Sequence, residues 1–256
     1  MELTSEELKS FLEQKVSQYN TLTFIDNDPI AVPHAFSKKE DIEIAGFFAA
    51  TIAWGNRKSI LSNAQSLMKR MDNAPYDFIR NHTIDDLSVF SGFVHRTFQE
   101  EDVVYFVQRL QQLYKEYGSL ENLFAPNKEE QNTHDALSRF HQLFFAVPHP
   151  KRTRKHIANP ERKSAAKRLH MFLRWMVRKD TAGVDLGIWN TISTSVLSCP
   201  LDVHSGNVAR ALGLLKRKQN DLAAVIELDR QLRQMDPIDP VKYDYALFGL
   251  GVFEGF

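Results

Sequence analysis

Residues 41–54 read DIEIAGFFAATIAW. Apart from the acidic residues near its start, this stretch is apolar on nearly every face of a helix. A helix of this length without a polar face is buried at the centre of a globular protein. We therefore expect residues 41–54 to form the core helix around which the rest of the chain packs.

A short polar turn follows the core helix. Residues 54–58, WGNRK, lead into a second helix whose apolar residues recur at helical spacing. These residues are Ile60, Leu61, Ala64, Leu67 and Met71. Such a turn is most often a plain connection between helices, and the sequence alone favours that interpretation. The alternative is a loop that presents Trp54, Asn56 and Arg57 to a ligand.

Helical patterns account for most of the remaining chain. Thr4 and Glu7 are spaced as a capping box that opens a helix over about residues 6–19. A long amphipathic helix lies within residues 92–124 and is closed at Gly118. Further helices are predicted at residues 75–78, 85–90, 134–147, 164–180, 222–234 and 243–253. No stretch predicts a strand, so the expected fold class is all-α.

The domain organisation is expected to be simple. The chain shows no internal repeat and no linker that would separate domains. With 256 residues, of which 43% are hydrophobic, it can bury one large core or two lobes with a cleft between them. We expect one globular unit, 1–256, with lobes at about 41–147 and at 1–40 plus 148–256. Residues 148–163, PHPKRTRKHIANPERK, contain almost nothing apolar and predict an exposed loop.

Charge is distributed unevenly although the formal net charge is zero. Residues 1–50 contain nine acidic and four basic residues, whereas residues 150–180 contain eleven basic and two acidic ones. A wholly basic nucleic-acid binder is therefore disfavoured, but a local basic surface is expected. Lys167, Arg174 and Arg178 share one helical face with apolar neighbours. Lys167 would then be less solvated than a surface lysine, as a nucleophilic amine requires, unless the stripe is simply a solvated basic face.

Cys199 is the only cysteine in the chain. It therefore permits no internal disulfide, no four-cysteine zinc site and no cysteine-ligated iron–sulfur cluster. The nine histidines have no metal-ligand spacing, so we expect no metal and no cofactor, although a site built from carboxylates alone stays open. The acidic start MELTSEEL does not resemble a signal peptide, and no apolar run reaches the ~20 residues of a membrane span. We expect a cytoplasmic protein that does not enter a membrane.

Residues 199–215, CPLDVHSGNVARALGLL, place a carboxylate at the start of a helix. Either Asp202 or Ser205 is the expected N-cap. The positive end of the helix dipole would keep Asp202 ionised there, and His204, Ser205 and Asn207 would offer hydrogen bonds to a ligand. An ordinary cap is the commoner role of such an aspartate.

Two resemblances follow from these segments. With KRLHMFLRWMVR, PLDVHSGNVARALGLL and DPVKYDYALFGLGVF, nearly the whole chain closely resembles an uncharacterised bacterial family of Bacteroidetes type. More distantly, it resembles the helix-hairpin-helix DNA glycosylase superfamily, of the endonuclease III and 8-oxoguanine glycosylase type. The segment PLDVHSGNVARALG is similar to the context of that superfamily's catalytic aspartate. FAATIAWGNRKSILSNA resembles its early helix and the loop that wedges into DNA.

The chain departs from this superfamily at the hairpin. Ala158–Arg162 lack the two glycines of the superfamily's hairpin. Lys167 and Lys163 precede Asp202 by 35 and 39 residues, a longer separation than in the superfamily. The resemblance therefore implies an insertion around residues 183–198.

The superfamily resemblance implies a two-lobed helical fold with a cleft between the lobes, and a DNA glycosylase with AP-lyase activity. Lys167 or Lys163 would be the nucleophile, and Asp202 would stabilise the charge that develops on the sugar. The partner would be double-stranded DNA with a damaged base, bound by a monomer. The residues implied in DNA contact are Trp54, Asn56, Arg57, Arg162, Arg168, Arg174, His204, Ser205 and Asn207. Two alternatives stay open: a non-catalytic nucleic-acid-binding protein on the same fold, and a helical protein-interaction module.

Overall fold

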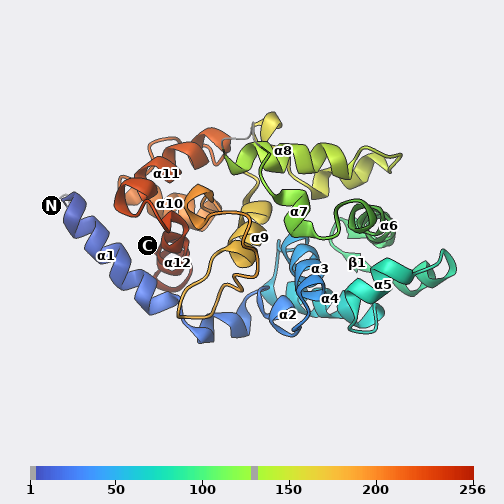
Figure 1. Cartoon of the computed structure of the whole chain (residues 1–256). Coiled ribbons are helices and arrows are strands. Elements are labelled where there is room, and N and C mark those ends of the chain that lie inside the picture. The colour runs from blue at the N-terminus through green and yellow to red at the C-terminus, as the bar shows by residue number, and fades with distance from the viewer. Residues whose placement is uncertain (1–3, 128–131) are drawn as a thin grey trace.

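The computed structural model describes residues 4–127 and 132–256. It is mostly helical, and its only sheet among these residues has two strands, which confirms the helical fold class (Figure 1). The α-helices are α1 (Ser5–Tyr19), α2 (Ala31–His34), α3 (Lys39–Thr51), α4 (Arg57–Arg70), α5 (Pro75–Asn81), α6 (Glu100–Tyr117), α7 (Leu120–Phe124), α8 (Thr133–Phe144), α9 (Lys167–Val177), α10 (Val203–Ala211), α11 (Leu222–Met235) and α12 (Tyr243–Gly249). Short 3-10 helices are η1 (Leu22–Asn27), η2 (Asp85–Phe90), η3 (Lys151–His156), η4 (Pro160–Arg162), η5 (Thr194–Val196) and η6 (Pro240–Lys242), and η7 (Leu250–Glu254) is a short π-helix.

Helix α3 is the core helix that the sequence predicts. Every residue from Ile42 to Thr51 is buried, so the absence of a polar face is explained by packing on all sides. The ring of Phe47 meets aromatic rings from three other helices. These are Phe106 of α6, Phe140 of α8 and Phe172 of α9. The helix ends at Thr51, earlier than the expected Trp54.

Buried apolar side chains form two clusters. The larger cluster surrounds α3 and takes residues from α4, α6, α8 and α9, whereas the smaller one is built from α1, α10, α11 and α12. In Figure 1, α1 and α10 to α12 lie on one side, α3 to α8 lie on the other, and α9 lies between them. Ala165, just before α9, belongs to the smaller cluster, and Phe172 belongs to the larger one. The buried apolar residues of α9 itself belong to the larger cluster, so the chain passes from the smaller cluster to the larger one where α9 begins.

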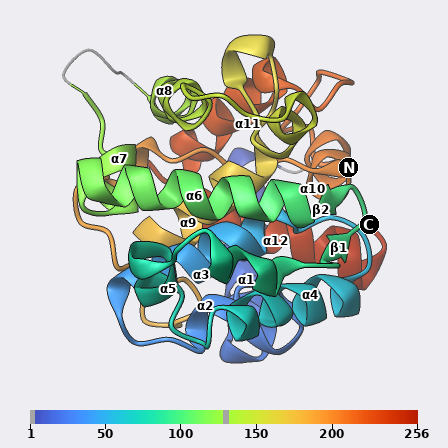
Figure 2. The same cartoon turned by 90° about the vertical axis from the view of Figure 1, so that its right-hand side faces the viewer.

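A short β-hairpin corrects the expectation that the chain contains no strand. β1 (Val94–His95) and β2 (Phe98–Gln99) pair antiparallel at the start of α6, and β1 lies beside α4 (Figure 2). Strands of two residues are too short to produce an alternating pattern in the sequence. As a result α6 begins at Glu100, later than its pattern suggested, and ends as predicted at Gly118, which is left-handed (φ 78°).

The expectation of an exposed loop over residues 148–163 is wrong in part. The segment contains η3 and η4, and Thr153 and His156 within it are buried. Thr153 Oγ1 donates to Asp102 Oδ1 at 2.6 Å, and an Arg152 guanidinium nitrogen donates to Asp102 Oδ2 at 2.8 Å. Polar contacts with this buried carboxylate of α6 hold the basic segment against the larger core, because the segment has few apolar residues to bury.

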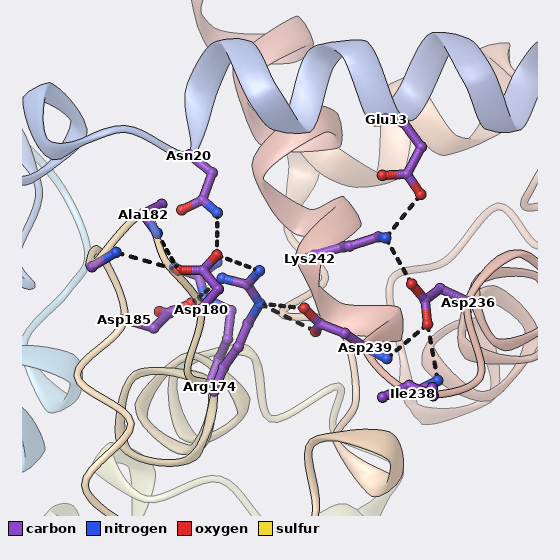
Figure 3. Close-up of polar contacts among 12 residues, drawn as sticks. Glu13, Asn20, Arg174, Asp180, Ala182, Asp185, Asp236, Ile238, Asp239 and Lys242 are labelled. Atoms are coloured by element: carbon purple, nitrogen blue, oxygen red, sulfur yellow. Dashed lines mark hydrogen bonds and ion pairs between the residues drawn. The ribbon is translucent and has the colours of Figure 1, made fainter.

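Arg174 and Arg178 do not form an exposed basic stripe, since they are only 3% and 2% exposed. Both donate to Asp185, at 3.1 Å from Arg174 and 3.0 Å from Arg178. Arg174 also donates to Asp244 of α12, and Arg178 donates to two further aspartates. These are Asp180 at 2.7 Å and Asp239 at 2.9 Å. Figure 3 shows Arg174 together with Asp180, Asp185 and Asp239 of this network. The network fixes α9 to the following loop and to α12.

Candidate functional site

A cavity of about 400 Å³ lies between segments of the two clusters. Its walls come from η1, the α3–α4 turn, the first residues of α9 and α10, and α12. Its volume lies within the range of small-ligand sites, about 300–1,000 Å³. Six residues singled out in the sequence line it: Trp54, Arg57, Lys167, Arg174, Asp202 and His204.

Asp202 is the N-cap of α10. Its Oδ1 accepts the Ser205 backbone N–H at 3.0 Å, while its own N–H donates to Ser205 Oγ at 2.9 Å, which completes a capping box. The side chain of Asn220 fixes the cap from outside by donating to the Asp202 carbonyl at 2.8 Å. Of the two N-caps that the sequence allowed, the structure selects Asp202. Its Oδ2 is the oxygen nearer to Lys167, which lines the same cavity.

Lys167 is the first residue of α9, and an unusual backbone places it there. Ala166 has left-handed dihedral angles (φ 46°), as does Lys163 (φ 64°), although neither is a glycine. Between them, Ser164 bridges Asp221, and the Leu222 N–H donates to the Lys163 carbonyl at 3.0 Å. The start of α9 is thus anchored to the start of α11. Left-handed non-glycine residues are strained, and such strain is concentrated near functional sites.

Lys167 Nζ lies 3.6 Å from Asp202 Oδ2, with the two side chains 28% and 21% exposed. The two residues are 35 positions apart in the sequence and come from the first turns of two different helices. Because Asp202 Oδ1 is occupied by the cap, the carboxylate is held in one orientation toward the amine. An amine and an oriented carboxylate in one cavity can perform covalent catalysis at an electrophilic carbon.

Two further carboxylates line the cavity and were not anticipated from the sequence. Asp28, at the end of η1, is 8% exposed, and burial raises the pKa of its carboxyl above the usual value. Burial also raises the pKa of Asp244, to about 6, against the opposing effect of the Arg174 charge. Neither residue belongs to a periodic pattern or a known spacing; an Asp-Pro pair at Asp28 signals only a turn.

Trp54 is held in place by its neighbours. The Arg168 guanidinium lies 4.8 Å from the Trp54 ring centroid, and the His156 ring is stacked 5.8 Å from it. Arg168 also donates to the Thr51 carbonyl and, at 3.2 Å, to the His156 carbonyl. Burial lowers the pKa of this arginine to about 10. The Arg168 side chain is therefore engaged with protein groups beside the cavity.

The aromatic side chains of Phe24 and Phe248 form an apolar part of the cavity wall. Their ring centroids are 6.0 Å apart in an edge-to-face arrangement. The Arg57 guanidinium lies over Phe248, 5.2 Å from its centroid. An aromatic wall next to carboxylates suits a flat ligand that also carries hydrogen-bond donors.

A second, basic cavity of about 500 Å³ adjoins the first, and Lys167 lines both. Among its other lining residues are Arg154, Lys155, Arg162 and Arg168. Its position next to the Lys167–Asp202 pair makes it the strongest candidate for an anion-binding surface. The sequence identified Arg162 and Arg168 there.

The other predicted residues lie outside the first cavity. Lys163 is exposed and is absent from the lining of both cavities. Asn56 is exposed at the N-cap of α4, where its side chain accepts the Ser59 N–H at 3.2 Å. Ser205 is buried in the α10 cap, and Asn207 is exposed on α10. The structure therefore separates the two candidate lysines, since only Lys167 lies beside Asp202.

Metal-ligand clusters and membrane-spanning helices are both absent from residues 4–127 and 132–256. No group of three or more histidine, cysteine, aspartate or glutamate side chains is arranged to hold a metal ion. No helix in this part of the chain has the length and apolarity that crossing a membrane requires.

Comparisons with known proteins identify one family. The model of a family described as a protein of unknown function (DUF2400) matches residues 28–253, which include the lining of the second cavity and, except for Phe24, that of the first. No curated protein and no solved structure matches the chain.

Proposed function

The chain belongs to the DUF2400 family, and from the geometry of its cavity we propose that this protein is a DNA-repair glycosylase with AP-lyase activity. The observation that carries the proposal is the 3.6 Å approach of Lys167 Nζ to Asp202 Oδ2 inside a cavity of ligand size. The resemblance of the Asp202 segment to the catalytic segment of helix-hairpin-helix glycosylases supports the same conclusion, as does a cavity between two helical cores.

The proposed reaction begins with extrusion of a damaged base into the cavity, because C1′ of a stacked nucleotide is inaccessible. The Lys167 amine forms a bond to C1′ as the glycosidic C–N bond breaks, and the base leaves with the bonding electrons and takes up a proton. The nitrogen then loses one proton, and the C1′–O4′ bond breaks as O4′ takes up a proton, so the sugar ring opens to a protonated imine. Removal of a C2′ proton expels the 3′ phosphate. Asp202, held by its cap, stabilises the positive charge that develops on the sugar.

The basic cavity supplies the proposed contact with the DNA backbone. Arg154, Lys155 and Arg162 line it next to Lys167, so phosphates flanking the extruded nucleotide would lie there. We propose that the exposed Asn56, on the polar turn beside the first cavity, enters the duplex. Trp54 instead is held by Arg168 and His156, so we propose that it forms the cavity wall.

The test is reductive trapping. Purified protein is incubated with duplexes that contain 8-oxoguanine, uracil or an abasic site in the presence of borohydride, which reduces an imine to a stable covalent adduct. We expect trapping by the wild type, loss of trapping in Lys167→Ala, and retention in the matched control Lys163→Ala. The proposal is refuted if the wild type processes none of the three duplexes. Loss of trapping only in Lys163→Ala would refute the assignment of the lysine.

A non-catalytic DNA-binding protein is the second candidate. It is favoured by one observation, that the Asp202 carboxylate already serves as a helix cap. It predicts binding that weakens steeply with salt, without an imine or strand cleavage. The same trapping experiment, run beside a binding titration at several salt concentrations, separates the two candidates.

A further inference from the structure

Asp28 is a buried carboxylate, and among the described residues no group donates a hydrogen bond to one of its two oxygens. Its Oδ1 accepts the Ile30 N–H at 3.1 Å, an Asx turn that asparagine would make equally well. Within the described residues, Oδ2 accepts no hydrogen bond and no cation lies within ion-pair distance, although the residue is only 8% exposed. Asp28 lines the first cavity, so its unused oxygen is available to a ligand there.

A buried carboxylate oxygen without a partner destabilises the folded protein when no ligand is bound. Burial without a partner disfavours the charged form, and it raises the pKa of Asp28. The positive charges of Arg174, Lys167 and Arg57 act in the opposite direction from farther away. A ligand that donates hydrogen bonds to Oδ2 would supply the interaction that the free protein lacks.

The chemistry of the ligand follows from the groups around Asp28. Hydrogen bonds donated by a ligand favour the ionised form of Asp28 and so oppose the effect of burial. An ionised carboxylate only accepts hydrogen bonds, so it selects a ligand edge made of donors. The rings of Phe24 and Phe248, on the same cavity wall, suit the flat face of a base. Among nucleobase edges, that of guanine places a ring N–H directly beside an amino group. Adenine and cytosine each place an acceptor next to their amino group, and uracil flanks its N–H with two carbonyls that would repel a carboxylate.

We propose that Asp28 reads the extruded base by accepting hydrogen bonds from a ring N–H and an adjacent amino group, so that the substrates of this site are derivatives of guanine. This inference rests on the proposed glycosylase function and names the substrate class of that same cavity. Lys167 and Asp202 would act on the sugar, while Asp28 would contact the base.

The test compares Asp28→Asn with the wild type on three duplexes. They contain 8-oxoguanine, hypoxanthine, which lacks the amino group, and an abasic site, which has no base to read. The readout for each protein is the single-turnover rate of base excision divided by the rate of abasic-site trapping. Asp26→Asn changes an exposed aspartate of η1 and serves as the matched control. Thermal unfolding of each variant confirms that it is folded.

We expect the wild type to excise 8-oxoguanine at least tenfold faster than hypoxanthine. Asp28→Asn should lower the ratio for 8-oxoguanine at least tenfold, because its amide directs a donor at the donors of the base, whereas Asp26→Asn should keep the wild-type ratio. An unchanged ratio in folded Asp28→Asn, or equal excision of hypoxanthine, overturns the inference while the glycosylase function stands. Absence of trapping on the abasic duplex by the wild type overturns both.

Discussion

Replacing Asp202 with asparagine separates its two roles, because asparagine is as good an N-cap as aspartate. The variant keeps the acceptor for the Ser205 N–H, seen at 3.0 Å in the native cap, but removes the negative charge 3.6 Å from Lys167. At that separation two charges interact by about 4–5 kcal/mol at an effective dielectric constant of about 20. Both side chains are partly solvated, so the net loss of folding stability should not exceed about 1 kcal/mol.

The catalytic consequence of Asp202→Asn should be much larger. Removing a group preorganised toward the charge of a transition state typically costs a factor of ~10²–10³ in rate, about 3–4 kcal/mol. We therefore expect single-turnover base excision to fall by that factor while the melting temperature changes little. Asp202→Ala should lose the same activity and, in addition, about 1 kcal/mol of stability from the missing cap.

Two measurements test this reasoning: single-turnover kinetics on the duplex that the wild type processes, and chemical denaturation. Asp221→Asn makes the same substitution at the N-cap of α11, away from the first cavity, and is the matched control. Asp202→Asn activity within about threefold of the wild type, with loss only in Asp202→Ala, would show that Asp202 acts as a cap alone.

Three other predictions concern stability and DNA binding. Burial lowers the pKa of His170 to about 3, so the folded state binds fewer protons than the unfolded state, and the free energy of unfolding falls as the pH decreases from about 6.5. At pH 5 this effect is about 2 kcal/mol. Chemical denaturation at pH 7 and pH 5 should therefore show a smaller loss of stability at the lower pH in His170→Leu than in the wild type. A Cβ at Gly249 would lie 2.1 Å from the Tyr19 ring, so Gly249→Ala should destabilise the α1–α12 contact by about 1–3 kcal/mol in urea denaturation, and an unchanged midpoint would contradict this packing. Arg162→Ala should reduce the salt dependence of DNA affinity by about one unit of slope, as measured by fluorescence anisotropy, whereas an equal reduction in Lys216→Ala, outside the basic cavity, would contradict a specific phosphate contact.

Local signals in the sequence predicted the parts of the fold that depend on neighbouring residues. The core helix was recognisable because residues 42–51 have no polar face that could remain in water. The capping box at Thr4 was recognisable because Glu7 is three positions away, whereas at the start of α10 the sequence left Asp202 and Ser205 as alternative N-caps. The β-hairpin was missed because two residues are too few for an alternating pattern to repeat.

Contacts between distant segments could not be predicted in the same way. Arg174 and Arg178 read as a basic face because Asp185, Asp239 and Asp244, which neutralise them, are brought in by later segments. The buried position of Asp28 likewise depends on tertiary packing. The sequence suggested both Lys167 and Asp202, yet their contact depends on how the intervening residues fold.

The position of α9 between the two apolar clusters has a consequence for unfolding. Phe172 packs in one cluster, Ala165 packs in the other, and Arg174 pairs with Asp244 across to α12. Neither cluster can lose its structure without removing a wall of the other, so we expect denaturation in a single cooperative transition. Lys167 and Asp202 come together only in the intact fold. We therefore expect an opening that separates them to cost nearly the full free energy of unfolding.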